Sequence, residues 1–175
     1  PSPLPNPTHT CESRGRYTVH LSARGLDGHI GSTNQEVLAI ENYQITTSPS
    51  TWIDPSGMTA RSLSQNGVSA SIPLPFTFFF YGEPHNAVFM GANGLLGFDP
   101  SSLDSAANVE LPAASTPNGL ICPFWDALAP TANTQFYTGV TGSAPNRRFV
   151  ASWVGVQTTG TRPAPLTFQC LLEET

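Results

Sequence analysis

The chain contains no lysine, and its only strongly basic side chains are seven arginines among 175 residues. Charged residues make up 11% of the sequence, whereas about 25% is usual for soluble proteins. The net charge of −5 does not provide the basic surface that nucleic-acid binding requires, so we expect no nucleic-acid partner. Without lysine the chain also cannot form the phosphate-binding motif GxxxxGK[ST].

Long apolar runs are missing as well. The sequence has no stretch of about 18 consecutive apolar residues, so we expect no segment that spans a membrane. It begins at Pro1 without the charged and apolar regions of a secretion signal. We therefore expect either a processed mature form or a fragment.

Cysteine is scarce, and none of the three residues, Cys11, Cys122 and Cys170, lies in a CxxC pair. The four histidines are scattered, so a zinc site is not expected. In a secreted protein, three cysteines allow one disulfide and one free thiol. Cys122 and Cys170 fall in predicted strands, where they could be bonded to each other or be two small apolar core residues. Cys11 could equally be the bonded one.

Glycine and proline are abundant, with 15 and 17 residues, and hydrophobic residues make up 39% of the chain. This hydrophobic content argues against disorder, and the length suits one domain. Residues 1–15 are rich in proline and predict an extended arm, which either links to a preceding domain or docks on a neighbour. Residues 16–175 are predicted to form a single β-sandwich domain.

The strongest strand signal is the tract 76–81, which places five aromatic rings in six positions and carries no charge. An Asn93-Gly94 pair follows between the apolar runs 87–90 and 95–98. Asn-Gly tolerates positive φ at both central positions of a turn. The pattern therefore predicts a buried aromatic strand followed by a tight hairpin.

Further strands are predicted from alternating or β-branched segments that turn residues separate. These segments are 16–21, 36–45, 120–125, 134–140, 147–156 and 165–173. Residues 25–33 and 54–57 predict turns, and 99–117 predict a long loop with one short helical turn. About eight short strands without a helical period indicate an all-β fold, an antiparallel, jelly-roll-like β-sandwich with long loops and little helix.

Five blocks of the sequence carry a family resemblance. They are Leu74–Gly82, Val88–Phe98, Pro117–Asp126, Gly142–Trp153 and Leu166–Leu172. In order and spacing they resemble the nidogen-like or plexin-domain-like module, a β-sandwich of animal matrix and surface proteins that is also common in secreted bacterial proteins. The resemblance covers about residues 70–173. It implies an extracellular location and no catalytic set. Relatives add a Gly turn and one more strand after the last block, which implies that a final strand is lacking here.

Catalytic motifs are not found in the sequence. A nucleophile elbow, HExxH and an EF-hand loop are all missing. His20, His29 and His85 satisfy no spacing rule for a triad with Asp27 or Asp126. We expect these histidines to lie on the surface or at strand edges.

Asp126 ends a predicted strand and has two interpretations. Its carboxylate could bind Ca²⁺ together with loop carbonyls, or it could cap a turn by accepting backbone N–H bonds. Asn146 is expected to nucleate a turn. Arg147 and Arg148 should point to opposite faces of a strand, one of them pairing with Asp126 or Glu173. Apart from Ca²⁺, no cofactor is expected.

The three tryptophans have different contexts. Trp125 and Trp153 lie in predicted apolar strands and are expected in the core. Trp52 lies in a polar loop, where it either folds over the edge of the sandwich or forms, with Tyr43, a platform on which a sugar stacks. The residues expected to have structural roles are Phe76, Phe78, Phe80, Tyr81, Asn93, Gly94, Trp125, Asp126, Asn146, Arg147, Trp153 and Phe168.

These observations favour a non-catalytic extracellular module that serves structure or interaction. It would be a subunit of a surface assembly or part of a larger secreted protein. Its partners would be other protein chains, and a neighbour could complete the sandwich by adding a strand, with the proline-rich arm as one candidate donor. A carbohydrate-binding module and a secreted hydrolase are the alternatives.

Overall fold

We describe a computed structural model of the chain. The structure describes residues 15–24, 28–39, 45–47, 49, 51–111, 116–160 and 163–174. Contacts between Cα atoms divide the chain into two compact units, one comprising 1–48 with 81–83 and the other 49–80 with 84–175. The single domain that the sequence predicts over residues 16–175 stays a prediction, and the two units are described separately.

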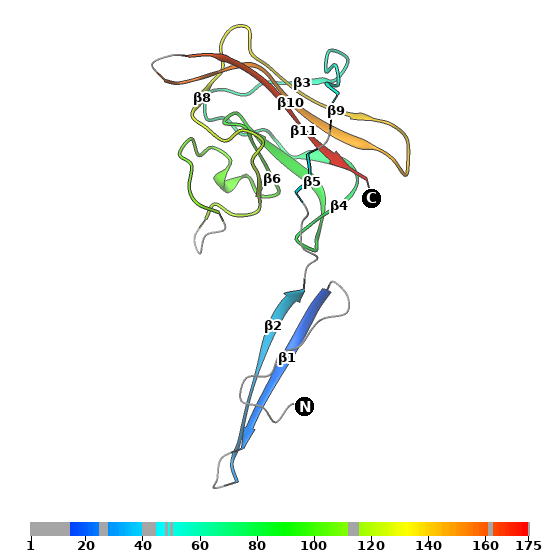
Figure 1. The fold of residues 1–175 in the computed structure, drawn as a ribbon, viewed down its shortest axis with the longest axis vertical. Helices are drawn as coiled ribbons and strands as arrows, with labels where there is room; N and C mark the ends of the chain where they lie inside the picture. The colour runs from blue at the N-terminus through cyan, green and yellow to red at the C-terminus, as the bar shows by residue number, and fades with distance from the viewer. Residues whose placement is uncertain are drawn as a thin grey trace. The chain divides into compact units, whose positions relative to one another are not determined.

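The first unit contains an antiparallel pair, β1 (Gly15–Arg24) and β2 (Ile30–Ala39). Their register runs without a break from Gly15↔Ala39 to Arg24↔Ile30. Figure 1 shows the pair as a two-stranded ribbon. The predicted strand 16–21 is confirmed. The predicted turn 25–33 is too long, because β2 already begins at Ile30. The predicted strand 36–45 is also too long, because β2 ends at Ala39 and residue 45 is not in a strand.

The second unit contains two antiparallel sheets. One has the order β11 (Pro165–Glu173), β10 (Arg148–Thr158), β9 (Gln135–Thr141) and β3 (Thr59–Arg61). A short fifth strand, β8 (Leu128–Ala129), pairs with the end of β10. Figure 1 shows β9, β10 and β11 as three long neighbouring ribbons. The predicted strands 134–140, 147–156 and 165–173 are therefore confirmed to within two residues.

The other sheet has the order β4 (Ile72–Phe80), β5 (Glu83–Gly91), β6 (Leu95–Gly97) and β7 (Leu120–Ile121). A single 3₁₀ turn, Pro100–Ser102, follows β6, and the side chain of Asp99 caps it by accepting the Ser101 N–H. This is the short helical turn that the sequence predicts.

Both sheets contribute to one hydrophobic core. Trp153 is fully buried, and its ring stacks on Phe168 at 5.0 Å between centroids. The cluster joins residues of the β4–β7 sheet with residues of the β3–β11 sheet, namely Ile72, Leu74, Phe76, Val88, Met90 and Leu96 from the first and Phe136, Phe149, Ala151, Trp153, Val156, Cys170 and Leu172 from the second. The all-β sandwich is confirmed.

The aromatic tract is only partly buried. Phe76 is buried and Phe78 and Phe80 are half-buried, whereas Phe79 and Tyr81 are both 47% exposed. Because side chains alternate across a strand, every second position of β4 faces away from the core. Tyr81 is not a strand residue, which corrects the prediction of a fully buried tract.

Positive backbone angles place the tightest turn at an unexpected position. Tyr81 and Gly82, which join β4 to β5, both have positive φ (50° and 82°), as a type I′ turn requires. At the Asn-Gly pair only Gly94 has positive φ (77°), and three residues separate the paired Gly91 and Leu95. The predicted hairpin is confirmed, but its connection is a three-residue loop rather than a two-residue turn.

The segment 120–125 also differs from the prediction. Only Leu120 and Ile121 form a strand, and Trp125 lies in the loop that follows. Trp125 is half-buried, and its Nε1–H donates to the carbonyl of Ser105 at 2.9 Å. A tryptophan keeps its N–H near a polar partner when it packs. The prediction that Trp125 belongs to the core was wrong, whereas that of Trp153 is confirmed.

Candidate functional site

The Asn93 side chain is a buried polar junction between two loops and strand β8. Its Nδ2 donates to Asn66 Oδ1 at 3.0 Å and to the Asp104 carbonyl at 2.9 Å, and its Oδ1 accepts the Leu128 N–H at 3.2 Å. Asn93 is fully buried, so these bonds replace the water that the amide loses on folding. Asn93, which the sequence predicts to be a structural turn residue, thus also links segments that are distant in sequence.

Asp126 acts as a local cap. Its Oδ1 accepts the Ala127 N–H at 2.7 Å, and its own N–H donates to the Asn93 carbonyl at 3.3 Å. Among the residues that the structure describes, no group of three or more His, Cys, Asp or Glu side chains could hold a metal ion. The geometry therefore favours the capping interpretation, and Ca²⁺ binding at Asp126 stays an untested prediction.

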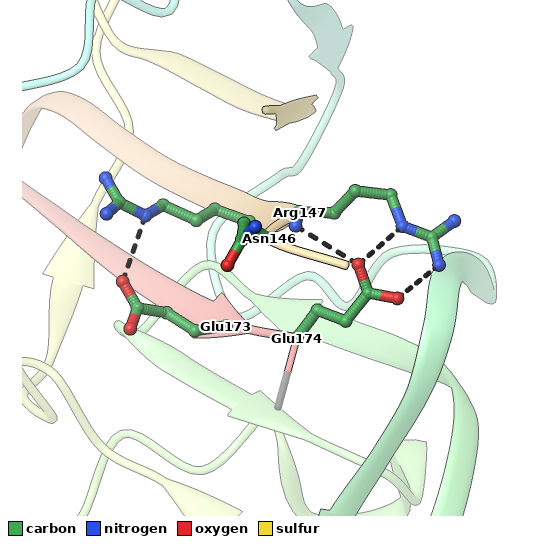
Figure 2. Close-up of a pocket in the computed structure, with 5 residues that line it drawn as sticks. Asn146, Arg147, Glu173 and Glu174 are labelled. Atoms are coloured by element: carbon green, nitrogen blue, oxygen red, sulfur yellow. Dashed lines mark hydrogen bonds and ion pairs between the residues drawn. The ribbon is translucent and has the colours of Figure 1, made fainter. Parts of the chain in front are cut away.

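Arg147 and Glu174 form a clasp where β10 begins and β11 ends. Glu174 Oε2 accepts from the backbone N–H of Arg147 at 3.1 Å and from its Nε at 2.8 Å, and Oε1 lies 2.5 Å from a terminal guanidinium nitrogen. The Glu174 N–H returns a bond to the Arg147 carbonyl at 2.8 Å. Figure 2 shows the three bonds that the Glu174 carboxylate accepts, beside the pair that Glu173 forms with Arg148, whose Nε lies 3.0 Å from Glu173 Oε1.

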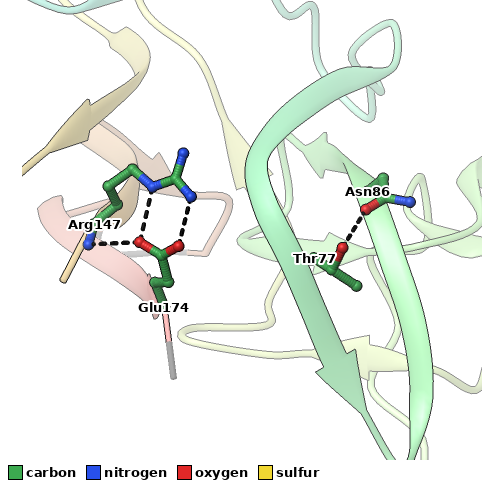
Figure 3. A network of polar contacts seen from close by, with 4 residues as sticks. All are labelled: Thr77, Asn86, Arg147 and Glu174. Atoms are coloured by element: carbon green, nitrogen blue, oxygen red, sulfur yellow. Dashed lines mark hydrogen bonds and ion pairs between the residues drawn. The ribbon is translucent and has the colours of Figure 1, made fainter. Parts of the chain in front are cut away.

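The clasp also reaches the opposite sheet. The Arg147 guanidinium lies over the Phe76 ring of β4, 5.8 Å from its centroid, at a distance suited to a cation–π contact. Figure 3 shows the clasp together with Thr77 on β4, whose hydroxyl donates to Asn86 on β5 at 2.8 Å. The sequence predicts that Arg147 or Arg148 pairs with Asp126 or Glu173, and in the structure Arg148 pairs with Glu173. The role of Glu174 was not predicted. Nothing in the sequence shows that the pairing of β10 with β11 extends one residue beyond Arg148↔Glu173, to Arg147 and Glu174.

The clasp should make stability depend on pH. Hydrogen bonds from Arg147 hold the pKa of Glu174 below its ordinary value, so the ionised pair stabilises the folded chain above the unfolded pKa of about 4.3. As pH falls through the lower folded pKa, that contribution disappears. We expect Glu174→Gln to lower the urea midpoint at pH 7 but to converge with the wild type once the pH falls below the lowered pKa of Glu174. Glu173→Gln, at a more exposed pair, is the matched control and should change little.

The outer edge of β11 is open. The Glu174 N–H points to β10, because it bonds Arg147. Since N–H directions alternate along a strand, the N–H groups of Leu171 and Gln169 point away from β10. Within the described ranges no strand pairs with that edge. β11 has no lysine, no charge before Glu173 and no proline after Pro165, so it lacks the usual protection against strand addition.

The edge strand of the other sheet is protected. β4 ends its sheet and carries Pro73 and Pro75 at alternate positions, where the exposed Pro73 and half-buried Pro75 lie between buried residues. Proline has no N–H to donate, so it is tolerated where that position faces away from the paired neighbour. The two prolines thus remove donors from one side of β4. Of the two long edge strands of the sandwich, only β11 offers a continuous donor row.

A segment here called the strap, residues 51–58, covers the outer face of the β3–β11 sheet. Gln169 of β11 holds it: its Oε1 accepts the Ile53 N–H at 3.2 Å, and its Nε2 donates to the Ile53 carbonyl at 2.6 Å and to Ser152 Oγ at 3.0 Å. Val150 and Ser152 face outward from the core yet are fully buried. The predicted turn at 54–57 is confirmed by the bond from the Met58 N–H to the Pro55 carbonyl.

The strap forms one wall of a shallow pocket of about 280 Å³. Trp52, 46% exposed, stands at this wall. Tyr137 on β9 lies in the floor, and its hydroxyl donates to Gln135 Oε1 at 2.7 Å. Tyr43, the predicted partner of Trp52, lies outside the described residues. The remaining lining residues are Asp54, Pro55, Ser56, Gln135, Val154 and Thr167.

A family model described as NIDO related matches residues 42–175, which is more than half of the chain. The chain belongs to the NIDO-related family. The searches of curated proteins and of solved structures found no match. The matched region coincides closely with the second unit, so the sandwich, its clasp and its strap are the NIDO-related part. Modules related to nidogen are typically extracellular and non-enzymatic, and the suspected resemblance is confirmed at the level of the family.

The cysteines of this NIDO-related chain do not pair as suggested. Cys122 is exposed and Cys170 is buried, and both thiols are free. Burial raises the pKa of Cys170 to about 12, so it is an inert core residue. A disulfide between Cys122 and Cys170, one of the predicted alternatives, is therefore wrong. Strand β7 ends at Ile121, and Cys122 lies outside the core in which Cys170 is buried. Cys11 lies outside the described residues.

The remaining predicted residues of the NIDO-related part have structural surroundings. Asn146 closes a turn by donating its N–H to the Ser143 carbonyl at 2.8 Å. Phe98 stacks on Phe78 and, at 3.9 Å between centroids, on His85. Phe168 packs between Trp153 and Phe124. In the part of the chain that the structure describes, no helix is long and apolar enough to cross a membrane.

Proposed function

We propose that this chain is a non-catalytic extracellular interaction module that associates through the open edge of β11. The partner strand is the β11 of a second copy, so that two sandwiches share one continuous sheet. The observation that supports this most directly is the uncharged row of outward N–H and C=O groups along Gln169 and Leu171, which no described strand satisfies. Such a subunit suits a surface assembly or a larger secreted protein.

The β11 edge is chemically compatible with its own copy. An antiparallel pair centred on Gln169 places Leu171 opposite Thr167 and Glu173 opposite Pro165, so no two carboxylates face each other. The arrangement is isologous and closes after two copies. The clasp at Glu174 holds the end of β11 against β10, which keeps the free edge extended for a partner.

A hydrolase receives no comparable support. His85 stacks on Phe98, and Asp126 is engaged with a neighbouring N–H. His20 lies on β1, in the other unit. These side chains therefore have individual structural contacts rather than the shared geometry of a nucleophile, a base and an orienting carboxylate.

The test removes one outward N–H without changing the β10–β11 ladder. We expect Leu171→Pro to abolish a dimer that the wild type forms, because the proline removes a donor that only the partner strand uses. Leu171→Ala keeps that N–H and should still dimerise. Size-exclusion chromatography with light scattering, over a range of concentrations, measures the mass of each.

A wild-type chain that remains monomeric at high micromolar concentration would refute self-pairing at β11. Equal dimerisation of Leu171→Pro and the wild type would place the contact elsewhere. The melting temperature of each variant, which should differ little in the monomer, shows whether the sandwich is intact. If a form with added C-terminal residues were monomeric while residues 1–175 dimerised, the chain itself would supply the strand.

A further inference from the structure

We propose that the pocket between the strap and the β3–β11 sheet binds a pyranose ring of a carbohydrate, stacked on Trp52. The site is separate from the edge of β11, so it stands or fails independently of strand pairing. It contains an exposed indole, a phenol and several polar side chains within about 280 Å³. This volume is just below the roughly 300–1,000 Å³ of pockets for drug-sized ligands, so we expect it to take a single sugar ring.

The strap holds Trp52 in place without covering it. On its C-terminal side, both backbone polar groups of Ile53 are bonded to the Gln169 side chain. Asp54 then accepts the Ser56 N–H at 3.0 Å and the Ser56 hydroxyl at 2.9 Å. A fixed backbone reduces the ordering cost of binding. The indole nevertheless stays 46% exposed, although burial of a tryptophan ring contributes substantially to folding.

The polar groups of the pocket have spare hydrogen-bonding capacity. Gln135 uses its Oε1 to accept from Tyr137, but within the described residues its amide hydrogens have no acceptor. The Thr167 hydroxyl accepts the Gly155 N–H at 3.1 Å, and its own hydrogen is not engaged there. The Trp52 Nε1–H has no acceptor in the same part of the chain. Donors from three segments therefore surround the aromatic surface.

These features match the chemistry of a sugar. A pyranose presents C–H groups on one face, which pack on an aromatic ring, and hydroxyls at its rim, which both donate and accept. The carboxylate of Asp54 and the phenol oxygen of Tyr137 supply acceptors beside the unused donors. A purely apolar ligand would leave these groups without partners, at a cost for each one buried.

A printed array of neutral and acidic oligosaccharides, probed with the full chain, tests the proposal, followed by calorimetric titration of the best glycan. We expect Trp52→Ala to lower its affinity at least about tenfold, as the loss of a central aromatic contact does. Gln135→Ala should lower it by a smaller factor. Phe79→Ala, which removes an equally exposed ring from β4, is the matched control and should bind like the wild type.

Two results would overturn the proposal. One is that the wild type binds no glycan on the array. This result overturns the proposal even if a proline-rich peptide binds the pocket. The other is glycan binding that Trp52→Ala and Gln135→Ala leave unchanged while Phe79→Ala weakens it. Gln135 is exposed, so Gln135→Ala keeps the test valid should Trp52→Ala lower the melting temperature.

Discussion

Replacing Gly94 by alanine is expected to prevent stable folding of the sandwich. A Cβ at this position would lie 1.9 Å from the Phe124 carbonyl oxygen and 3.2 Å from the Phe168 ring. The first contact is with backbone, which no side-chain rotation can relieve. The positive φ of 77° adds about 1–2 kcal/mol of strain for any residue with a Cβ. We expect a loss of at least about 4 kcal/mol, a large part of the stability of a small domain.

Gly119 provides the control for this prediction. Its φ of 70° is nearly the same, but a Cβ there meets nothing within 4 Å. Gly119→Ala therefore isolates the backbone strain and should cost only about 1–2 kcal/mol. Urea denaturation of the two variants compares them directly. Equal losses for Gly94→Ala and Gly119→Ala would show that the loop at Phe124 moves aside, and the close approach would then have no role in the fold.

The Asn93-Gly94 pair combines a feature that the sequence predicts with contacts that it does not. The sequence predicted a turn, and a turn is present, because the need of Gly94 for positive φ is local information. The approach of Phe124 and the three bonds of the Asn93 side chain are not local. They depend on segments up to 35 residues away in sequence. A single sequence does not show which distant backbone group will contact a given side chain.

The same distinction explains the errors elsewhere. Strand β11 was predicted with its observed bounds because its composition and its flanking turns are local signals. The short strands β3 and β8 were missed because three- and two-residue strands have almost no pattern of their own. In the candidate pocket, Trp52 was found because an aromatic ring in a polar loop is visible in sequence. Tyr137 was missed because in sequence it resembles any other strand residue. It lines the pocket only because Gln169 holds the strap over the sheet that contains it.

The family match and the open edge concern different levels of function. Members of the NIDO-related family are typically extracellular, but the family leaves the partner undefined. The contrast between β4 and β11 is more specific. The edge of β4 lacks N–H donors at Pro73 and Pro75, whereas β11 keeps every N–H donor after Pro165. If strand addition occurs, the prolines direct it to β11 and away from the aromatic strand.

Trp153→Ala is the second change from which we expect a large effect, a loss of about 3–5 kcal/mol. The side chain is fully buried between the two sheets, and its ring stacks on Phe168 with an interplanar angle of 16°. Its Nε1–H also donates to the Gly91 carbonyl of β5 at 2.9 Å, so the residue joins the sheets both by packing and by a hydrogen bond. Removing it leaves a cavity and takes from the Gly91 carbonyl the shorter of its two hydrogen bonds, so that only the Gly94 N–H, at 3.3 Å, still donates to it.

Two further variants separate these contributions to the free energy of unfolding. Trp153→Phe keeps most of the packing but loses the bond to Gly91, and it should cost about 1–3 kcal/mol. Trp125→Ala removes the half-buried tryptophan, whose Nε1–H reaches a loop carbonyl rather than the opposite sheet, so its cost should fall below that of Trp153→Ala. Urea denaturation gives all three values. If Trp125→Ala proved as damaging as Trp153→Ala, the two sheets would not owe their attachment mainly to Trp153, and the loop at Trp125 would be as much a part of the core as the strands are.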